Sequence, residues 1–299
     1  MLPGAMRYYN LNIAGYNIRL ETSDDGPDLW PAERFQRNIS QSNNFDVIIK
    51  VHRGYYSLPE DSERLFVAPY SVEVKDMKIT TRDNFWSVYR HQSGMFLATN
   101  FPANHNKTAV LKFSLIIREW DLWIDGFNGS TDPLEYPLDG LVLYYLTVIS
   151  GDIMIHASGV NIAGRGYLFS GTSGKGKSTI ARICGESGAT IIHDDRLIIR
   201  SINGEYHMYN TPVYRDDKPE ESLLHRIFLI EHGNENKIVP VAGATAVSLV
   251  IANCIQHNYN PELIARFLGS VSIMCSVIPI ASLHFRPDRR VIDHILENE

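Results

Sequence analysis

The stretch "FSGTSGKGKSTIARI", residues 169–183, places three glycines and two lysines between an apolar run and a helix-forming sequence. Its centre, "GTSGKGKS" at 171–178, fits the phosphate-loop pattern G-x-x-x-x-G-K-[ST]. Glycines in such a loop adopt backbone angles that a β-carbon would forbid. The backbone N–H groups can then turn inward around phosphate oxygens, at which the following helix also points its positive N-terminal end.

The side chains of this stretch predict a nucleotide site. Lys177 can reach the β- and γ-phosphates, and the Ser178 hydroxyl can ligate Mg²⁺. A glycine-rich turn with a surface lysine is the alternative, but the flanking strand and helix patterns favour the phosphate loop. The predicted nucleotide-binding residues are Gly171, Thr172, Ser173, Gly174, Lys175, Gly176, Lys177, Ser178 and Thr179.

The sequence on both sides of the loop predicts the local fold. "IMIHASGVNIAG" and "RGYLFSG" indicate a hairpin before the loop, and a helix is expected from about Lys177 to Glu186, ending near Gly188. A strand, "ATIIH", follows. This order of strand, loop, helix and strand is that of a βαβ unit, which predicts a parallel pairing in the sheet.

An acidic doublet, Asp194 and Asp195, follows that strand sixteen and seventeen residues after Ser178. Carboxylates at the end of a strand suit the crevice where ligands bind in open α/β sheets. One carboxylate can hold Mg²⁺, usually through water. The other can accept a proton from an attacking hydroxyl. A solvated turn is the alternative, which the nearby phosphate loop makes less attractive.

The whole chain of 299 residues divides, on its patterns, into two predicted domains. Residues 1–130 read as a β-rich domain, and residues 131–299 as an α/β domain with the phosphate loop at the C-terminal edge of its sheet. The turn-rich segment "FNGSTDPLEYP" marks the boundary. All four tryptophans fall in the first part, where core packing is favoured over a ligand or partner surface.

Composition excludes several classes of protein. The net charge of −6 argues against a nucleic-acid partner, because nucleic-acid-binding domains usually carry a basic patch. The longest apolar run, "LVLYYLTVI", is far short of the roughly 20 residues that span a bilayer. The three cysteines lie far apart, and the start lacks a signal-peptide pattern. We therefore expect a cytoplasmic protein with no membrane partner.

His156, the "GTSGKGKS" loop and the "HDD" triplet together resemble the HPr kinase/phosphorylase family, whose nucleotide fold is similar to that of phosphoenolpyruvate carboxykinases. The short gap between loop and doublet is the specific feature. The resemblance covers residues 150 to about 215, and "YNTPVYRDD" is similar to bacterial HPr-kinase-related proteins. It implies a P-loop-containing, phosphoenolpyruvate carboxykinase-like α/β domain, in a chain that is α+β overall.

The resemblance also implies a role for each site residue. Lys177 would bind phosphate, and Ser178 with Asp195 would hold Mg²⁺. Asp194 would be the general base for an acceptor hydroxyl, and His156 would lie near Asp194 and orient it. The implied cofactors are ATP, or another nucleoside triphosphate, and Mg²⁺. A purely structural role is the alternative for His156.

Three departures from the family concern the acceptor rather than the nucleotide. The "EIRGLG"-like signature of true HPr kinases is not found after the doublet. Thr179 stands where an acidic residue often follows the loop serine. Residues 1–130 do not match the regulatory domain of true HPr kinases.

These observations predict an ATP-dependent kinase that phosphorylates a hydroxyl of a protein, a peptide or a small molecule. A nucleotide-binding regulator without transfer activity is the main alternative, and a small-molecule carboxykinase is a third. HPr kinases form ring-like assemblies, so a homo-oligomer is also considered. Further candidates for phosphate or acceptor contacts, with ordinary surface roles as their alternative, are Arg215, Arg286, Arg289 and Arg290.

Overall fold

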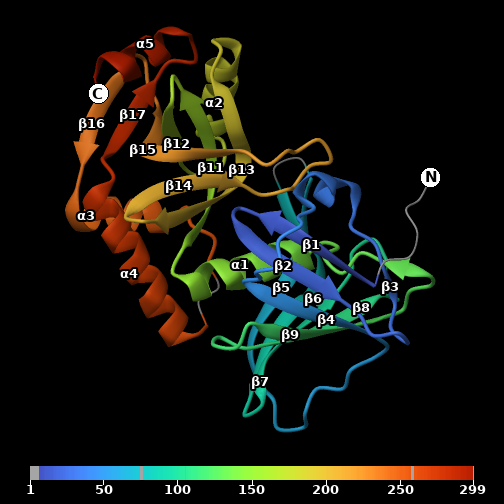
Figure 1. Cartoon of the computed structure of the whole chain (residues 1–299). Coiled ribbons are helices and arrows are strands. Elements are labelled where there is room, and N and C mark those ends of the chain that lie inside the picture. Colours follow the sequence, from blue (N-terminus) through green and yellow to red (C-terminus); the bar gives the residue numbers. More distant parts are fainter. Residues whose placement is uncertain (1–6, 75–76, 105, 257–258, 299) are drawn as a thin grey trace. The chain divides into compact units, whose positions relative to one another are not determined.

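A computed structural model describes residues 7–74, 77–104, 106–256 and 259–298. The chain forms two compact units, Met1–Leu143 and Tyr144–Glu299 (Figure 1). The sequence places the boundary at residue 130, in a turn-rich segment. Ser130 and Thr131 form a short parallel pairing with Asp28 and Leu29, so this segment is built into the first unit.

In the described part of the first unit, eight strands form one sheet, in the order β1-β2-β4-β9-β8-β7-β6-β5. Strand β4 pairs in parallel with β2 and β9, and the other neighbours are antiparallel. The elements of this unit are β1 (Tyr8–Ile13), β2 (Tyr16–Glu21), β3 (Asp28–Leu29), a 3-10 helix (Glu33–Asn38), β4 (Val47–Arg53), β5 (Glu63–Val74), β6 (Met77–His91), β7 (Gly94–Asn100), β8 (Thr108–Phe113), β9 (Glu119–Asp125) and β10 (Ser130–Thr131).

The tryptophans of this unit do not all serve the core. Trp120 is fully buried and Trp86 nearly so. Trp30 and Trp123 are half-buried, and Trp123 stacks on Tyr56 with ring centroids 4.0 Å apart. Core packing therefore accounts for two of the four side chains.

Helix α1 (Leu138–Ser150) crosses the division between the units. It is almost wholly buried, as expected for a helix that is apolar on every side. None of the described helices is long and apolar enough to cross a membrane.

In the described part of the second unit, seven strands form a sheet, in the order β12-β11-β13-β14-β15-β17-β16. The strands are β11 (Ile153–Ile162), β12 (Arg165–Ser170), β13 (Thr190–Ile202), β14 (Glu205–Asn210), β15 (Glu221–His232), β16 (Lys237–Val241) and β17 (Ile280–Phe285). The helices are α2 (Lys177–Glu186), α3 (Gly243–Ile251), α4 (Pro261–Val277) and α5 (Arg290–Glu297).

Helices cover both faces of this sheet, which makes three layers. On one face, Phe169 and Phe228 pack with Ile180 of α2 and Ile295 of α5. On the other face, α3 and α4 pack on the sheet through residues such as Val250 and Phe267. In Figure 1, α2 and α5 accordingly lie apart from α3 and α4. The mixed α/β fold class predicted from the sequence is confirmed at this level.

The expected parallel pairing across the loop and helix α2 is wrong in its detail. Strands β12 and β13 run parallel, but β11 lies between them and pairs antiparallel with both. The parallel neighbour of β12 is β15. Because β11 forms a hairpin with β12 and also pairs with β13, it separates the two parallel strands of the βαβ unit.

The pairing of β12 with β15 closes a circuit of strands, since β15 also pairs with β14. Gly166 lies where these strands converge. A β-carbon at Gly166 would lie 2.3 Å from the Leu223 carbonyl oxygen and 2.8 Å from both Met208 Cε and Ser222 Oγ. Only a residue without a β-carbon fits at this crossing.

We predict that Gly166→Ala lowers the melting temperature by several degrees, because the added methyl group must push backbone apart. The matched control is Gly269→Ala in α4, where an added β-carbon meets nothing within 4 Å. This control should raise the free energy of unfolding by up to about 1 kcal/mol, because alanine favours helix over glycine. Thermal unfolding of both variants tests the crossing, and equal stability of the two would contradict it.

Candidate functional site

The predicted phosphate loop connects the end of β12 to the start of α2, and Lys177 is the first helical residue, as the sequence predicts. Gly174 and Gly176 are left-handed, with φ of 81° and 97°. A β-carbon at Gly176 would also lie 3.0 Å from the Phe285 ring. These two glycines therefore permit the turn that exposes the first N–H groups of α2, which have no carbonyl partner within their own helix.

Lys177 is buried under the loop. Its Nζ donates hydrogen bonds to the carbonyl oxygens of Gly171 at 2.7 Å and Thr172 at 3.3 Å. Burial lowers the pKa of Lys177, and the charges of Asp194 and Asp195 partly oppose that effect. The ammonium group thus lies within the electric field of the acidic doublet.

Strand β15 supports the loop from the other side. Lys175 forms an ion pair with Glu231 at 2.5 Å, and His232 Nε2 lies 2.9 Å from the Gly174 carbonyl oxygen. Lys175, one of the predicted nucleotide contacts, is therefore engaged by the protein itself. Thr172, Ser173 and Ser178 are exposed, and Thr179 is half-buried.

The acidic doublet lies inside a strand rather than at its end. Strand β13 continues from Thr190 to Ile202, because Leu197 and Ile199 add buried apolar residues beyond the doublet. Its register nevertheless sets the doublet level with the loop, since Ala157 of β11 pairs with Ser170 on one side and Asp195 on the other. Two strand spacings, about 10 Å, separate these two backbones.

Asp194 lies on the same face of the sheet as helix α2. It is in register with Ser158 of β11, which is in register with Phe169 of β12. The Phe169 ring belongs to the core beneath α2, and residues directly opposite each other share a face. Ser158 Oγ donates a hydrogen bond to Asp194 Oδ1, and Asp194 is otherwise exposed. A carboxylate has about four lone-pair sites, so this bond does not saturate it.

Asp195 has a different partner, His156. Their Nδ1 and Oδ1 atoms are 3.1 Å apart, and the hydrogen bond from His156 is the main cause that holds the pKa of Asp195 below its usual value. The resemblance placed His156 beside Asp194. The side-chain contact that the structure shows for His156 is with the second aspartate of the doublet.

His193 is a structural support that the sequence analysis missed. It is 5% exposed, and its Nδ1 accepts hydrogen bonds from the backbone N–H groups of Asp195 at 3.1 Å and Arg196 at 3.2 Å. The ring proton is therefore on Nε2, which lies 3.3 Å from Asp217 Oδ2. The imidazole thus fixes the backbone of the doublet and ties it to a later loop.

That later loop, residues 211–217, is organised by the same carboxylate. Asp217 Oδ2 also accepts hydrogen bonds from the N–H groups of Val213 at 2.8 Å and Tyr214 at 2.6 Å. The exposed Tyr214 ring stacks on His193. Desolvation raises the pKa of Tyr214, with further contributions from Asp195 and Asp194. The loop therefore brings a phenol into the field of the doublet.

The residues fit a magnesium-bound phosphate in kind. Left-handed glycines, a buried lysine and an exposed serine at a helix N-terminus are what a phosphate loop requires. Among the residues that the structure describes, no three His, Cys, Asp or Glu side chains gather as a metal site. Mg²⁺ usually binds one or two carboxylates together with water and phosphate oxygens, a set to which Ser178 could contribute. Asp195 is in register with Ala157 of the core beneath α3 and α4, so it lies on the opposite face of the sheet from Asp194.

Two of the four arginines named as further candidates lie in surface ion pairs. Arg290 forms a two-pronged pair with Asp288, and Arg286 Nε is 4.0 Å from the same carboxylate. These contacts favour surface roles for both side chains.

No family model matches this sequence, and no curated protein matches it. Among solved structures, the HPr(Ser) kinase/phosphatase from Coxiella burnetii is similar at 10% identity, over 48% of this chain and 94% of that chain, with a TM-score of 0.31. This similarity is distant and structural only, so the function of this chain is inferred below from its own residues.

We predict that His156→Ala raises the pKa of Asp195 towards the ordinary value of about 3.9. The folded-state pKa is depressed, so this carboxylate stabilises the fold above its unfolded pKa and loses that effect as the pH falls through the folded pKa. Carboxyl-carbon NMR titration measures the change. The matched control is Ser158→Ala, which removes a partner of Asp194 and should leave Asp195 unchanged. An unaltered Asp195 titration in His156→Ala would refute the pairing.

Proposed function

We propose that this chain is an ATP- and Mg²⁺-dependent kinase that transfers a phosphoryl group to a hydroxyl acceptor. One observation carries the proposal. An exposed carboxylate, Asp194, lies on the α2 face of the sheet, level with the phosphate loop and close enough to Lys177 to affect its pKa. A site that only binds phosphate does not need an accessible carboxylate beside its lysine.

The loop would bind and neutralise phosphate. The N–H groups at the start of α2 and the Lys177 ammonium group supply positive charge, which Gly174 and Gly176 make accessible. A bound magnesium nucleotide would supply the transferable γ-phosphoryl group. Phosphoryl transfer needs little covalent chemistry from the protein, so positioning and charge neutralisation are the main tasks of these residues.

Asp194 would act as the general base. As the acceptor oxygen forms its bond to the γ-phosphorus, the bond from that phosphorus to the β,γ-bridging oxygen breaks and the nucleoside diphosphate leaves. Asp194 takes the proton of the attacking hydroxyl and later returns it to solvent. The hydrogen bond from Ser158 fixes one carboxylate oxygen, which orients the group without saturating it.

Asp195 would serve the metal side of the site through its charge. It lies on the opposite face of the sheet from Asp194, but its charge still affects the pKa of Lys177. His156 lowers the pKa of Asp195, which favours the charged carboxylate. Negative charge near the loop would favour a bound Mg²⁺. The two aspartates thus have separate partners, Ser158 and His156, in keeping with separate tasks.

We predict that magnesium ATP raises the melting temperature of the chain, because a ligand selective for the folded state stabilises it by mass action. Lys177→Ala should remove most of this shift, since the buried ammonium group is lost from the loop. The control, Lys50→Ala, removes an exposed lysine of the first unit that pairs with Glu119, and it should keep the full shift. Differential scanning fluorimetry measures all three proteins. A full shift in Lys177→Ala would exclude the loop as the nucleotide site.

The doublet separates a kinase from a nucleotide-binding regulator. Asp194→Asn keeps the side-chain size but removes the base, so turnover should fall by about 10²–10⁴ while ATP affinity barely changes. Asp195→Asn should weaken Mg²⁺-dependent nucleotide binding as well as turnover. Calorimetry measures affinity, and release of labelled phosphate to acceptor or water measures turnover. Full activity of Asp194→Asn would remove this residue from the mechanism.

A further inference from the structure

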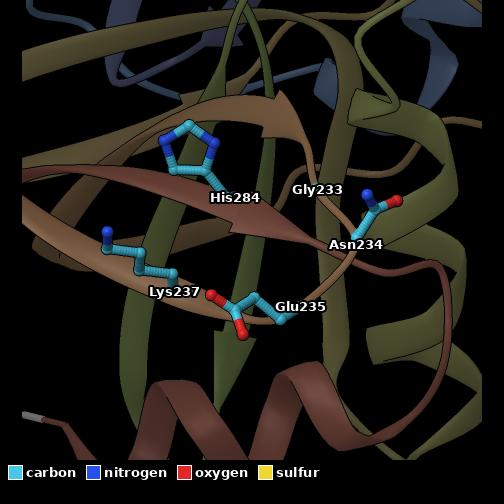
Figure 2. Close-up of a pocket in the computed structure, with 5 residues that line it drawn as sticks. All are labelled: Gly233, Asn234, Glu235, Lys237 and His284. Atoms are coloured by element: carbon cyan, nitrogen blue, oxygen red, sulfur yellow. The ribbon is translucent and has the colours of Figure 1, made fainter.

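A pocket of about 340 Å³ lies at the ends of β15 and β17, and β15 pairs with β12, the strand that leads into the phosphate loop. It is lined by Gly233, Asn234, Glu235, Lys237 and His284. Figure 2 shows Asn234 and Glu235 on the connection between β15 and β16, with Lys237 and His284 on the neighbouring strands. The volume is within the range of small-molecule sites.

The pocket and the loop share their supports. His232, the residue before Gly233, contacts the carbonyl oxygen of Gly174. Phe285, the residue after His284, packs against Gly176 at the start of α2. The pocket therefore adjoins the residues that hold the phosphate loop.

Strand pairing at the level of the loop places three features along one line. Asp195 of β13, Ala157 of β11, Ser170 of β12 and Leu229 of β15 are paired in turn, and the pocket lies beyond them at the ends of β15, β16 and β17. The loop thus lies between the doublet and the pocket. This is the order of parts in a phosphoryl-transfer complex, in which the acceptor, the phosphates and the nucleoside follow one another.

We propose that this pocket holds the nucleoside part of the nucleotide whose phosphates lie in the loop. The inference rests on the proposed function and deepens it. With the γ-phosphate directed at Asp194, the remaining phosphates would lead away from the doublet towards the pocket, which lies on the other side of β12.

The lining residues suit a nucleoside chemically. The Glu235 carboxylate can accept hydrogen bonds from ribose hydroxyls, as acidic residues do in dinucleotide sites. The Asn234 amide can both donate to and accept from the edge of adenine, a pairing that asparagine also makes with this base in DNA. His284 adds a flat ring on which a base can stack.

Gly233 determines the shape of the pocket. A β-carbon at this position would lie 2.9 Å from His284 Cβ and 3.1 Å from the Phe285 nitrogen. The Gly233 N–H group donates to the Phe285 carbonyl oxygen at 3.1 Å. The absence of a side chain lets the connection pass close to β17, which sets Asn234 and Glu235 beside His284.

The test compares two ligands on the full chain by calorimetry in the presence of Mg²⁺. ATP carries the nucleoside, whereas inorganic tripolyphosphate carries only the phosphates. The double variant Asn234→Ala/Glu235→Ala should weaken ATP binding about tenfold, the effect of losing about two hydrogen bonds. Its affinity for tripolyphosphate should stay within about twofold. The matched control is Glu262→Ala, which removes an exposed carboxylate from α4 and should alter neither affinity.

Each other outcome counts against the inference in a distinguishable way. Equal affinity of the unaltered chain for ATP and tripolyphosphate would overturn the nucleoside site but leave the phosphate site intact. An equal loss of affinity for ATP and for tripolyphosphate in the double variant would mean that Asn234 and Glu235 support the loop instead. If the unaltered chain bound neither ligand, the proposed function itself would fail, and the inference with it.

Discussion

Strand β11 pairs on one edge with β12 and on the other with β13, and this double pairing sets the geometry of the site. Ala157 lies between Ser170, where the phosphate loop begins, and Asp195. A shift of one residue in either register would turn Asp194 to the opposite face of the sheet, away from α2. The buried residues Ile153 and Ile155 on the same strand oppose such a shift, because it would remove them from the core that they form with α3 and α4.

The charges around the loop are arranged in two separate groups. On one side, Asp194 and Asp195 act on Lys177 from β13, and each has a partner on β11. On the other side, Glu231 on β15 pairs with Lys175. Because Glu231 is neutralised by Lys175, it does not compete with phosphate for the buried Lys177.

Local sequence patterns predicted the helices and strands. The differences between prediction and structure arose from pairing between strands that are distant in sequence. Helix α2 begins and ends as predicted, because a glycine loop and Gly188 mark its ends in the sequence itself. The insertion of β11 between β12 and β13 could not be predicted in this way, since strand neighbours depend on contacts distant in sequence. The same holds for His193, which stood in the quoted "HDD" triplet but whose partner, Asp217, is supplied by a later loop. The roles of the site residues stay predictions.

The loop motif occupies eight consecutive residues, yet its supports come from much later in the chain. His232 ends β15 and Phe285 ends β17, the last strand of the sheet. During synthesis from the N-terminus, the ribosome therefore completes "GTSGKGKS" well before either support exists. Contacts of such sequence separation form slowly, because a long segment must first be ordered. A chain that stopped before Ile280 would keep every residue of the motif but lack the aromatic ring against which Gly176 packs.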